Sequence, residues 1–408
     1  MKRLLMVAYH FPPMAGSSGI QRTLRFVKYL PEFGWEPMVL SAHPRAYDRT
    51  NPELLADIQK ETVVVRAPAF DTARHFSIAG RYPGFLARPD RWASWLPGAT
   101  IMGLSMIKRY KPDAIWSTFP IATAHLIGAA LHKHSGLPWI ADFRDPMAQD
   151  GYPSDPLTWK SFKKIEERAT KEAALCTFTT PGAARLYAQR YPHAANRFRV
   201  IENGYDEESF EGIAPEGGAL NPGKITLLHS GIVYPSERDP TQLLQSVRAL
   251  IDAGQISTKQ FCIRFRASMH EAFLQTLIDK FALKDCIELL PPISYSEALN
   301  EMVRADVLLI MQATNCNDQV PAKLYEYLRA GRPILALTDP IGDTATVLRK
   351  AGISAIAPLD QSSAISEALT KILKSPTVGA LPSADAITDS SRKNRTRQFS
   401  TLLDATTA

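Results

Sequence analysis

Short apolar runs of strand length alternate with helix-length segments along almost the whole chain, and this order constrains the fold more than any single motif. The first half has strand-like runs at 4–9, 37–41, 62–66, 114–117, 139–143, 176–179 and 198–201, with helices predicted at 20–33, 101–110, 125–134 and 157–174. The second half has runs at 225–230, 261–266, 287–289, 307–311, 334–337 and 354–357, with helices at 241–253, 271–281, 297–303, 321–330, 346–350 and 364–374. Strands that alternate with helices form a parallel sheet covered on both faces. The sequence therefore predicts an α/β protein with two doubly wound, Rossmann-like domains in tandem.

A segment rich in Gly and Pro separates the two halves between Glu211 and Gly223. Such composition is typical of a linker, and 408 residues exceed the size of one typical hydrophobic core. We predict a first domain over 1–205, a linker over 206–223 and a second domain over 224–384. The remaining residues, 385–408, are expected to return to the first domain as a helix at 392–403.

Composition gives no sign of a membrane span or a secreted disulfide framework. Hydrophobic residues make up 45% of the chain and charged residues 22%, and no apolar run approaches the roughly 20 residues that cross a bilayer. The apolar N-terminus is short and continues into Phe11-Pro12-Pro13, so a buried strand is favoured over a signal peptide. The four cysteines are far apart and lack metal-type spacing, as do the histidines. We expect reduced thiols, no metal and a cytoplasmic location.

Positive charge is concentrated in the first half, although the net charge of the whole chain is only +6. Basic clusters occur at 108–111 and 160–168. They are suited to anionic lipid headgroups or a phosphate-bearing acceptor, which predicts peripheral contact with the inner face of a membrane. For the second cluster, a solvated helix face balanced by Glu166, Glu167 and Glu172 is the alternative. Nucleic acid is not an expected partner, because no recognisable binding module accompanies the charge.

A helix predicted to begin at Pro321 lacks a good side-chain cap. Proline is suited to the first helical position, which places the cap at Val320, a residue without an oxygen acceptor. The amides of Ala322, Lys323 and Leu324 are then left for a ligand. Free amides at a helix N-terminus attract phosphate, and the Lys323 ammonium adds positive charge. An ordinary helix–turn–strand unit that ends at Gly331 is the alternative.

Three other loops are predicted at the carboxyl ends of strands, where ligands bind in open parallel sheets. The loop at 16–19 is rich in glycine but has neither GxGxxG nor P-loop spacing, which disfavours a nicotinamide dehydrogenase. The loop after 225–230 begins with Ser230 and Gly231 and carries Arg238, a possible phosphate partner or a surface ion pair. The run Asp142-Phe143-Arg144-Asp145 holds three charges that need solvation or pairing; it could bind an acceptor hydroxyl or form an internal Arg–Asp pair.

The chain resembles the retaining glycosyltransferases of family 4, which have the GT-B architecture, and the resemblance extends nearly from end to end. It is carried by YHFPP at 9–13, the glycine loop at 16–19, GWEPMVL at 34–40, DFRDP at 142–146, IENGYD at 201–206, Gly231 with RDP at 238–240, and PAKLYEYLRAGRP at 321–333. The resemblance implies two facing domains and transfer of a sugar from a nucleotide diphosphate donor with retention of configuration. It also implies that the second domain holds the donor, with no cofactor or metal expected.

Site roles follow from the resemblance residue by residue. Family members carry two glutamates with seven residues between them; Glu326 matches the second, implied to bind the ribose, and the shorter Asp318 stands at the first. Arg238 and Lys323 match the basic pair on the diphosphate. The predicted set is catalytic Asp318, Arg238 and Lys323; donor-binding Glu326, Gly231, Ser230, Ala322, Leu324 and Gly16; and acceptor-binding Ser18, Asp142, Arg144 and Asp145. Residues 117–120 occupy the region where many members have a histidine, and no role is assigned to His125.

The expected acceptor is a glycan or a lipid-linked glycan in surface polysaccharide or lipopolysaccharide synthesis. Two alternatives are a nucleotide-sugar 2-epimerase with the same fold, which needs no acceptor, and a non-catalytic partner in a polysaccharide assembly complex. The sequences at 142–146 and 203–206 favour the transferase over the epimerase. The aspartate at 318 favours the non-catalytic partner.

Overall fold

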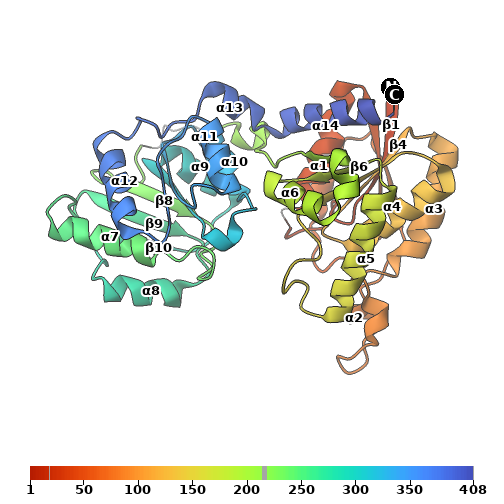
Figure 1. The fold of residues 1–408 in the computed structure, drawn as a ribbon, viewed down its shortest axis with the longest axis horizontal. Coiled ribbons are helices and arrows are strands. Elements are labelled where there is room, and N and C mark those ends of the chain that lie inside the picture. The colour runs from red at the N-terminus through yellow and green to blue at the C-terminus, as the bar shows by residue number, and fades with distance from the viewer. Residues whose placement is uncertain (18, 214–217, 408) are drawn as a thin grey trace. The chain divides into compact units, whose positions relative to one another are not determined.

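The computed structural model describes residues 1–17, 19–213 and 218–407, and it divides the chain into two compact units (Figure 1). Unit 1 comprises Met1–Glu202 and the C-terminal segment from Arg392, and unit 2 comprises Asn203–Ser391. The division therefore lies three residues before the predicted one at 205/206. The return to unit 1 begins at Arg392 rather than at residue 385, because the helix Ala384–Asp389 belongs to unit 2.

Unit 1 is built on a seven-stranded sheet with the order β3-β2-β1-β4-β5-β6-β7, and each neighbouring pair is parallel. The strands are β1 (Lys2–Val7), β2 (Trp35–Ala42), β3 (Val63–Ala67), β4 (Ala114–Thr118), β5 (Trp139–Arg144), β6 (Leu175–Phe178) and β7 (Phe198–Val200). The helices are α1 (Gly19–Tyr29), α2 (Thr72–His75), α3 (Trp95–Tyr110), α4 (Ala122–Ser135), α5 (Pro156–Glu172), α6 (Pro181–Arg190) and α14 (Arg392–Thr406). Helices α2 and α6 were not predicted from the sequence.

Unit 2 is built on a six-stranded parallel sheet with the order β10-β9-β8-β11-β12-β13. The strands are β8 (Ile225–Ser230), β9 (Phe261–Arg266), β10 (Ile287–Leu290), β11 (Val307–Met311), β12 (Ile334–Leu337) and β13 (Ile356–Ala357). The helices are α7 (Thr241–Asp252), α8 (Glu271–Lys280), α9 (Tyr295–Arg304), α10 (Lys323–Ala330), α11 (Asp343–Lys350), α12 (Ser362–Lys374) and α13 (Ala384–Asp389). The predicted α/β class with two parallel sheets is confirmed.

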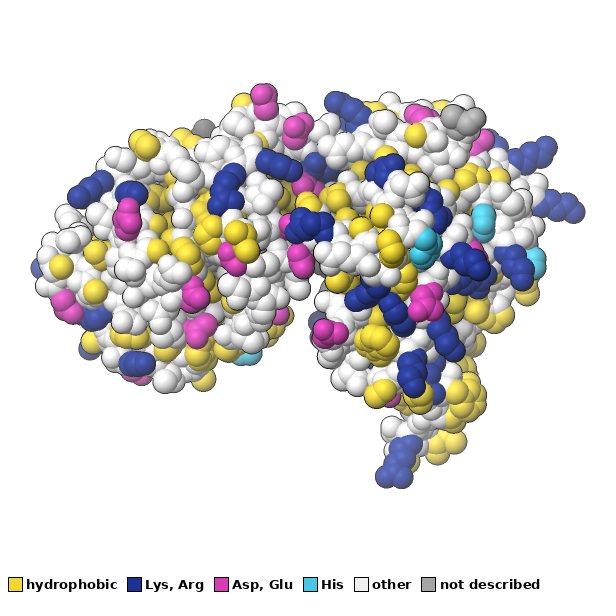
Figure 2. Space-filling view, viewed as in Figure 1, with side chains coloured by type: hydrophobic (Ala, Val, Ile, Leu, Met, Phe, Trp, Pro, Cys, Tyr) yellow, Lys and Arg dark blue, Asp and Glu magenta, His cyan; other side chains and the backbone are white. Residues whose placement is uncertain are grey.

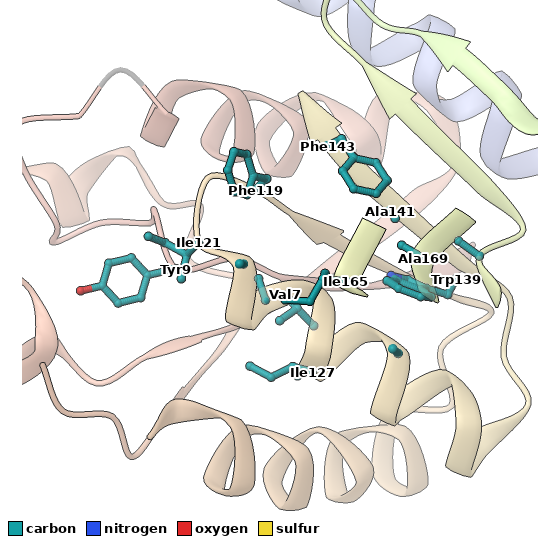
Figure 3. Packing of buried hydrophobic residues seen from close by; sticks show 14 of the residues in the cluster. Val7, Tyr9, Phe119, Ile121, Ile127, Trp139, Ala141, Phe143, Ile165 and Ala169 are labelled. Atoms are coloured by element: carbon teal, nitrogen blue, oxygen red, sulfur yellow. The ribbon is translucent and has the colours of Figure 1, made fainter. Parts of the chain in front are cut away.

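Both faces of the unit 1 sheet are buried, as the continuous apolar runs require. Along β1, Leu5 and Val7 belong to one core cluster and Leu4 and Met6 to another, because successive side chains in a strand point to opposite faces. Figure 3 shows the first cluster, where β-strand side chains such as Val7 and Phe143 pack with side chains of the covering helices.

The C-terminal helix α14 completes the second cluster of unit 1. Phe399 is 1% exposed and stacks on Phe26 of α1 with ring centroids 4.8 Å apart. Leu403, one turn further on, is also buried. This packing explains why the chain returns to unit 1 at its end.

The first part of the predicted linker is packed into unit 2. Tyr205 and Phe210 are buried in a core cluster with residues of β8, β11 and β12, and Glu207 forms an ion pair with Arg329 of α10. The segment that begins at residue 206 is therefore part of unit 2 and not a linker, because the apolar side chains of Tyr205 and Phe210 anchor it in the core of that unit. Residues 214–217 of that linker lie outside the described residues.

Among the described residues, none of the helices has both the length and the apolar composition that a membrane span requires.

Candidate functional site

The order of the unit 2 sheet reverses between β8 and β11, so the loops that follow these two strands diverge there. Ligands of open parallel sheets bind at such a reversal, beyond the carboxyl ends of the strands. The loop after β8 carries Gly231 and Arg238, and the loop after β11 leads through Asp318 to the start of α10. The topology thus brings together the two segments in which the sequence predicts donor-binding residues.

A buried histidine at the end of β8 holds Lys323. Nε2 of His229 lies 3.2 Å from Nζ of Lys323, and Nδ1 of His229 donates to the carbonyl oxygen of Leu309 at 3.0 Å. Because Nδ1 carries the proton, Nε2 is free to accept a hydrogen bond from the lysine ammonium. Burial and the nearby charges of Lys323 and Arg238 hold the pKa of His229 well below its ordinary value. The histidine is therefore a neutral acceptor.

The pKa of Lys323 lies close to neutral pH. Burial and the charge of Arg238 lower the pKa of Lys323 to about 7, against a smaller opposing effect of Glu326. An anion placed beside this amine favours its protonated form. Arg238, whose side chain is 18% exposed, lies over the ring of Tyr234 and 3.5 Å from a carboxylate oxygen of Glu237. The positive charge of Arg238 thus acts on Lys323, and the two basic groups repel one another when no anion is present.

Gly231, directly after the end of β8, leaves space for the side chain of Lys323. Its φ is +115°, and a Cβ atom added there would lie 3.0 Å from Nζ of Lys323. A side chain at this position would be strained by the backbone angle and would push against the amine. Next to it, the amide of Ser230 donates to the hydroxyl of the buried Tyr327 at 2.9 Å. Tyr327 thereby fixes the end of β8 to α10.

The two acidic residues differ in their surroundings. Glu326 in the first turn of α10 accepts a hydrogen bond from the Tyr295 hydroxyl at 2.7 Å. Asp318 is exposed, in the loop that joins β11 to α10. The buried side chain of Gln312 secures that loop by donating to the carbonyl oxygens of Cys316 at 2.9 Å and Gln319 at 3.1 Å. The aspartate is therefore carried on a loop with fixed ends.

The start of α10 differs from the prediction. The helix begins at Lys323, and its cap position, Ala322, supplies no side-chain hydrogen bond. The Leu324 amide donates to the carbonyl oxygen of Pro321 at 2.9 Å, so the prediction that this amide is free for a ligand is wrong. The turn before the helix uses it. Among the backbone hydrogen bonds of the described residues outside regular elements, none involves the amides of Ala322 or Lys323. The predicted helix end at Gly331, with φ +65°, is confirmed.

The unit 1 sheet reverses between β1 and β4, and a second polar cluster lies beside the loop after β1. Nδ1 of His10 is 3.1 Å from the hydroxyl of Ser17. A Cβ on Gly19, the first residue of α1, would lie 2.5 Å from that same nitrogen and 2.8 Å from a guanidinium nitrogen of Arg144. Burial and the charge of Arg144 lower the pKa of His10 to about 4. The start of α1 is therefore packed closely between a neutral histidine and an arginine.

Asp142 occupies the core of unit 1 rather than a ligand site. It is 0% exposed and accepts hydrogen bonds from Nε and Nη2 of Arg22 at 3.0 and 2.8 Å, from Thr118 at 2.8 Å and from Thr177 at 2.7 Å. Burial alone would raise its pKa, but the adjacent Arg22 lowers it overall. The structure favours the internal Arg–Asp pair, with Arg22 as the unpredicted partner, and leaves Asp142 no oxygen directed to solvent for an acceptor.

The remaining predicted residues of unit 1 lie in its loops. Arg144 adopts φ +62° at the end of β5, and the exposed Asp145 accepts from the Thr179 hydroxyl at 3.3 Å. Gly16 has φ +83° and is exposed. Ser18 lies outside the described residues.

His125, to which no role was assigned, is a core residue of α4. Trp139 donates to the Ser117 hydroxyl at 2.8 Å, so Ser117 can donate to Nδ1 of His125 at 2.8 Å. Nε2 has no hydrogen-bond partner among the described residues, and burial lowers the pKa of His125 to about 4. The residue is neutral and structural.

The four cysteines are buried, and none forms a disulfide. In residues 1–17, 19–213 and 218–407, no group of three or more His, Cys, Asp or Glu side chains is arranged to hold a metal ion.

Sequence reasoning missed His229, Tyr327, His10 and Arg22. His229 was the last but one residue of a predicted strand, and a polar residue there is a recognisable signal, because the end of a parallel strand opens onto the ligand crevice. His10 directly follows the predicted first strand in the same way. Tyr327 carried no comparable signal, since its hydroxyl acts through a contact with β8 that is distant in sequence.

Solved structures similar to this chain share its two-domain fold. HepE from Anabaena in complex with UDP and glucose has a TM-score of 0.63 at 12% identity, covering 99% of this chain and 100% of that one. A glycosyltransferase from Rickettsia africae has a TM-score of 0.67 at 13% identity, with 99% and 98% covered. A trehalose 6-phosphate synthase from Burkholderia multivorans has a TM-score of 0.65 at 13% identity, with 99% and 97% covered. These likenesses confirm the GT-B fold. A sequence search of curated proteins finds no match.

Two tandem Rossmann-like units, each with its loops at a strand-order reversal, define the class of this protein as GT-B. Residues 18–204, which make up most of unit 1, match the model of the glycosyl transferase 4-like domain. The chain has the GT-B fold, and its N-terminal unit belongs to the glycosyl transferase 4-like domains. The predicted class and family resemblance are confirmed.

Proposed function

We propose that this glycosyltransferase moves a sugar from a nucleotide diphosphate donor to a glycan or lipid-linked acceptor, with retention of the anomeric configuration. The observation that carries the proposal is the pairing of Lys323 with neutral His229 beside Arg238, at the N-terminus of α10. The likeness to HepE, whose solved structure contains UDP and glucose, supports a nucleotide-sugar donor. In surface polysaccharide or lipopolysaccharide synthesis, the acceptor would be presented at a membrane.

The donor diphosphate would bind between the loop after β8 and the start of α10. Lys323, Arg238 and the amides of Ala322 and Lys323 supply its positive environment. Glu326 would bind the ribose, with the Tyr295 hydroxyl holding its carboxylate at 2.7 Å. Ser230 and Gly231 allow close approach of the ligand to the backbone, and Asp318 would contact the donor sugar.

The chemical step is chiefly electrostatic. The bond between the anomeric carbon and the leaving phosphate oxygen breaks, the bond to the acceptor oxygen forms, and the acceptor proton passes to the leaving phosphate. Negative charge grows on the diphosphate as an oxocarbenium-like centre develops. Fixed positive groups lower the barrier because they are already oriented toward that charge. The proposal requires no metal and no cofactor.

Unit 1 would hold the acceptor. Arg144 and Asp145 at the end of β5 are the proposed acceptor contacts, together with Ser18, and Gly16 is the proposed contact of this unit with the donor. The buried Asp142 would act only by positioning β5 through its bonds to Arg22 and Thr177. The basic character of this unit supports peripheral contact with an anionic membrane, which would keep the enzyme near a lipid-linked acceptor.

Release of nucleotide from a panel of nucleotide sugars, with and without a lipid-linked acceptor, tests this proposal. We expect release that depends on the acceptor, and a product with the donor's anomeric configuration by NMR. Conversion of the donor without acceptor would indicate an epimerase or hydrolase. Binding of donors without any turnover would indicate a non-catalytic partner in an assembly complex, and an inverted product would refute retention.

A further inference from the structure

An apolar and basic segment projects from unit 1 at residues 72–89, which include α2; we call it the apolar–basic hairpin. No acidic residue occurs between Asp71 and Asp90, whereas Arg74, Arg81 and Arg88 recur at intervals of seven. Within eleven residues, four large apolar side chains are exposed: Phe76 by 41%, Ile78 by 84%, Phe85 by 69% and Leu86 by 36%. Figure 2 shows yellow and dark-blue side chains gathered on the part of unit 1 that carries α2 in Figure 1.

The tip of this hairpin is a tight turn that presents its side chains outward. Ile78 and Arg81 pair through two backbone hydrogen bonds of 2.8 and 3.0 Å. The two residues between them, Ala79 and Gly80, have φ of +50° and +74°. Positive φ at both central positions is the geometry of a two-residue turn that closes a hairpin. An exposed isoleucine and an exposed arginine therefore stand side by side at the tip.

The base of the hairpin is fixed, so the exposure of its apolar side chains does not result from a loosely packed loop. The buried Thr72 hydroxyl lies 2.9 Å from the carbonyl oxygens of both Leu86 and Arg91. The buried Asp71 caps α2 through the Ala73 amide and is paired with Arg91. These bonds tie the two ends of the segment together in the interior of unit 1.

A projection with a fixed base, aromatic and aliphatic side chains at its surface and the exposed Arg81 at its tip is suited to a bilayer interface. Arg74 and Arg88 lie 3.8 and 3.9 Å from carboxylate oxygens of Asp48 and Asp155. Apolar side chains gain free energy by leaving water for the acyl boundary, while arginines bind anionic headgroups. Exposed apolar residues that occur singly need no explanation, but a contiguous group indicates an interaction site. The hairpin carries both a contiguous group of exposed apolar side chains and positive charge within one short segment.

We propose that the apolar–basic hairpin inserts into the headgroup region of an anionic lipid bilayer and docks unit 1 on the membrane. The inference rests on the peripheral membrane contact proposed above and gives that contact a location. It differs from the sequence-based expectation, which placed the contact at the basic clusters 108–111 and 160–168. Those clusters lack the group of exposed apolar side chains that the hairpin provides.

Co-sedimentation of the full chain with vesicles tests this docking. We expect binding to vesicles of phosphatidylcholine mixed with phosphatidylglycerol, and much less to phosphatidylcholine alone. The double variant Ile78→Ser/Phe85→Ser should bind the anionic vesicles at least about tenfold more weakly, because it lacks two apolar side chains that the wild type would bury in the bilayer. Arg81→Ser should weaken binding about fivefold. Ile341→Ser is the matched control, because Ile341 in unit 2 is also 84% exposed.

The outcomes distinguish two claims: that the protein binds an anionic membrane, and that the apolar–basic hairpin is the element that binds it. If the wild type binds and the hairpin variants bind equally well, the hairpin is not the docking element. If the wild type binds neither vesicle, the proposed membrane contact fails as a whole, while the donor chemistry of unit 2 is untouched. If the double variant instead abolishes a dimer detected by analytical ultracentrifugation, the hairpin pairs two copies of the chain and the lipid proposal is overturned.

Discussion

Nζ of Lys323 lies 3.2 Å from Nε2 of His229, which the Leu309 carbonyl oxygen keeps in the tautomer that accepts this hydrogen bond. The lysine thus has one neutral partner and a positive neighbour, Arg238. Its pKa is lowered to about 7. An amine held in this way gains a proton when an anion arrives, and this property links the site's geometry to measurable pH dependence.

Binding of a nucleoside diphosphate should take up a proton near neutral pH. The free enzyme's Lys323 pKa is about 7, and a bound diphosphate raises it. Below pH 7 the group is already protonated, so affinity should be flat; above pH 7 affinity should fall by up to about tenfold per pH unit. Calorimetry in buffers of different ionisation enthalpy measures the proton uptake. Lys323→Ala should abolish the uptake, and an unchanged uptake in that variant would assign it to another group.

Gly231→Ala should weaken diphosphate binding as well as the fold. The new Cβ would lie 3.0 Å from Nζ of Lys323 at a φ of +115°, so we expect a loss of about 1–3 kcal/mol in the free energy of unfolding together with lower affinity. Gly254→Ala is the control, because Gly254 also has a positive φ, +67°, but no heavy atom lies within 4 Å of the position that its new methyl group would take. Equal affinities of the two variants would show that Gly231 does not make room for the lysine.

Removal of Arg22 should destabilise unit 1 strongly. Its guanidinium pairs with Asp142 at 2.8 Å, and their side chains are 4% and 0% exposed. Arg22→Leu leaves a buried carboxylate without its charge partner, which typically costs about 3–5 kcal/mol. Arg168→Leu removes a partly exposed pair with Glu172 on α5, whose side chains are 36% and 34% exposed, and should cost less than about 1 kcal/mol. Chemical denaturation of both variants compares the two costs directly.

Unit 1 should lose stability in mild acid, because His125 is neutral when folded. Burial lowers its pKa from 6.5 to about 4, so the unfolded chain binds more protons between these values. Stability contributed by this group is present above pH 6.5 and falls by up to about 1.4 kcal/mol per pH unit as the pH drops toward 4. His125→Gln should reduce this slope, whereas His134→Gln, at an exposed position, should not. Identical slopes in all three proteins would contradict this assignment.

The sequence predicted the order of strands well because their apolar runs are long and bounded by turn residues. β8, β9, β11 and β12 have the predicted bounds, and α14 was predicted from the spacing of Phe399, Leu402 and Leu403. Helix α6 was missed because Pro181-Gly182 at its start suggests a turn, although proline in the first turn is compatible with a helix.

The candidate site was only partly predictable, because several of its groups act through distant partners. Lys323 and Arg238 could be found from motif positions, but the tautomer of His229 depends on a carbonyl group eighty residues away. Asp142 and Asp145 looked equivalent in sequence. The side-chain partners of Asp142, Arg22 and Thr177, come from other elements and place it in the core.

The most direct test of the account is the turnover rate of Lys323→Ala and Arg238→Ala with a nucleotide sugar and acceptor that the wild type uses. Loss of a positioned donor to the leaving diphosphate should lower kcat by about two orders of magnitude in each variant. Lys371→Ala, which removes an exposed lysine of α12 paired with Glu367, should turn over at the wild-type rate. If both site variants transfer sugar as fast as the wild type, Lys323 and Arg238 do not stabilise the leaving group, and the donor site proposed for unit 2 is wrong.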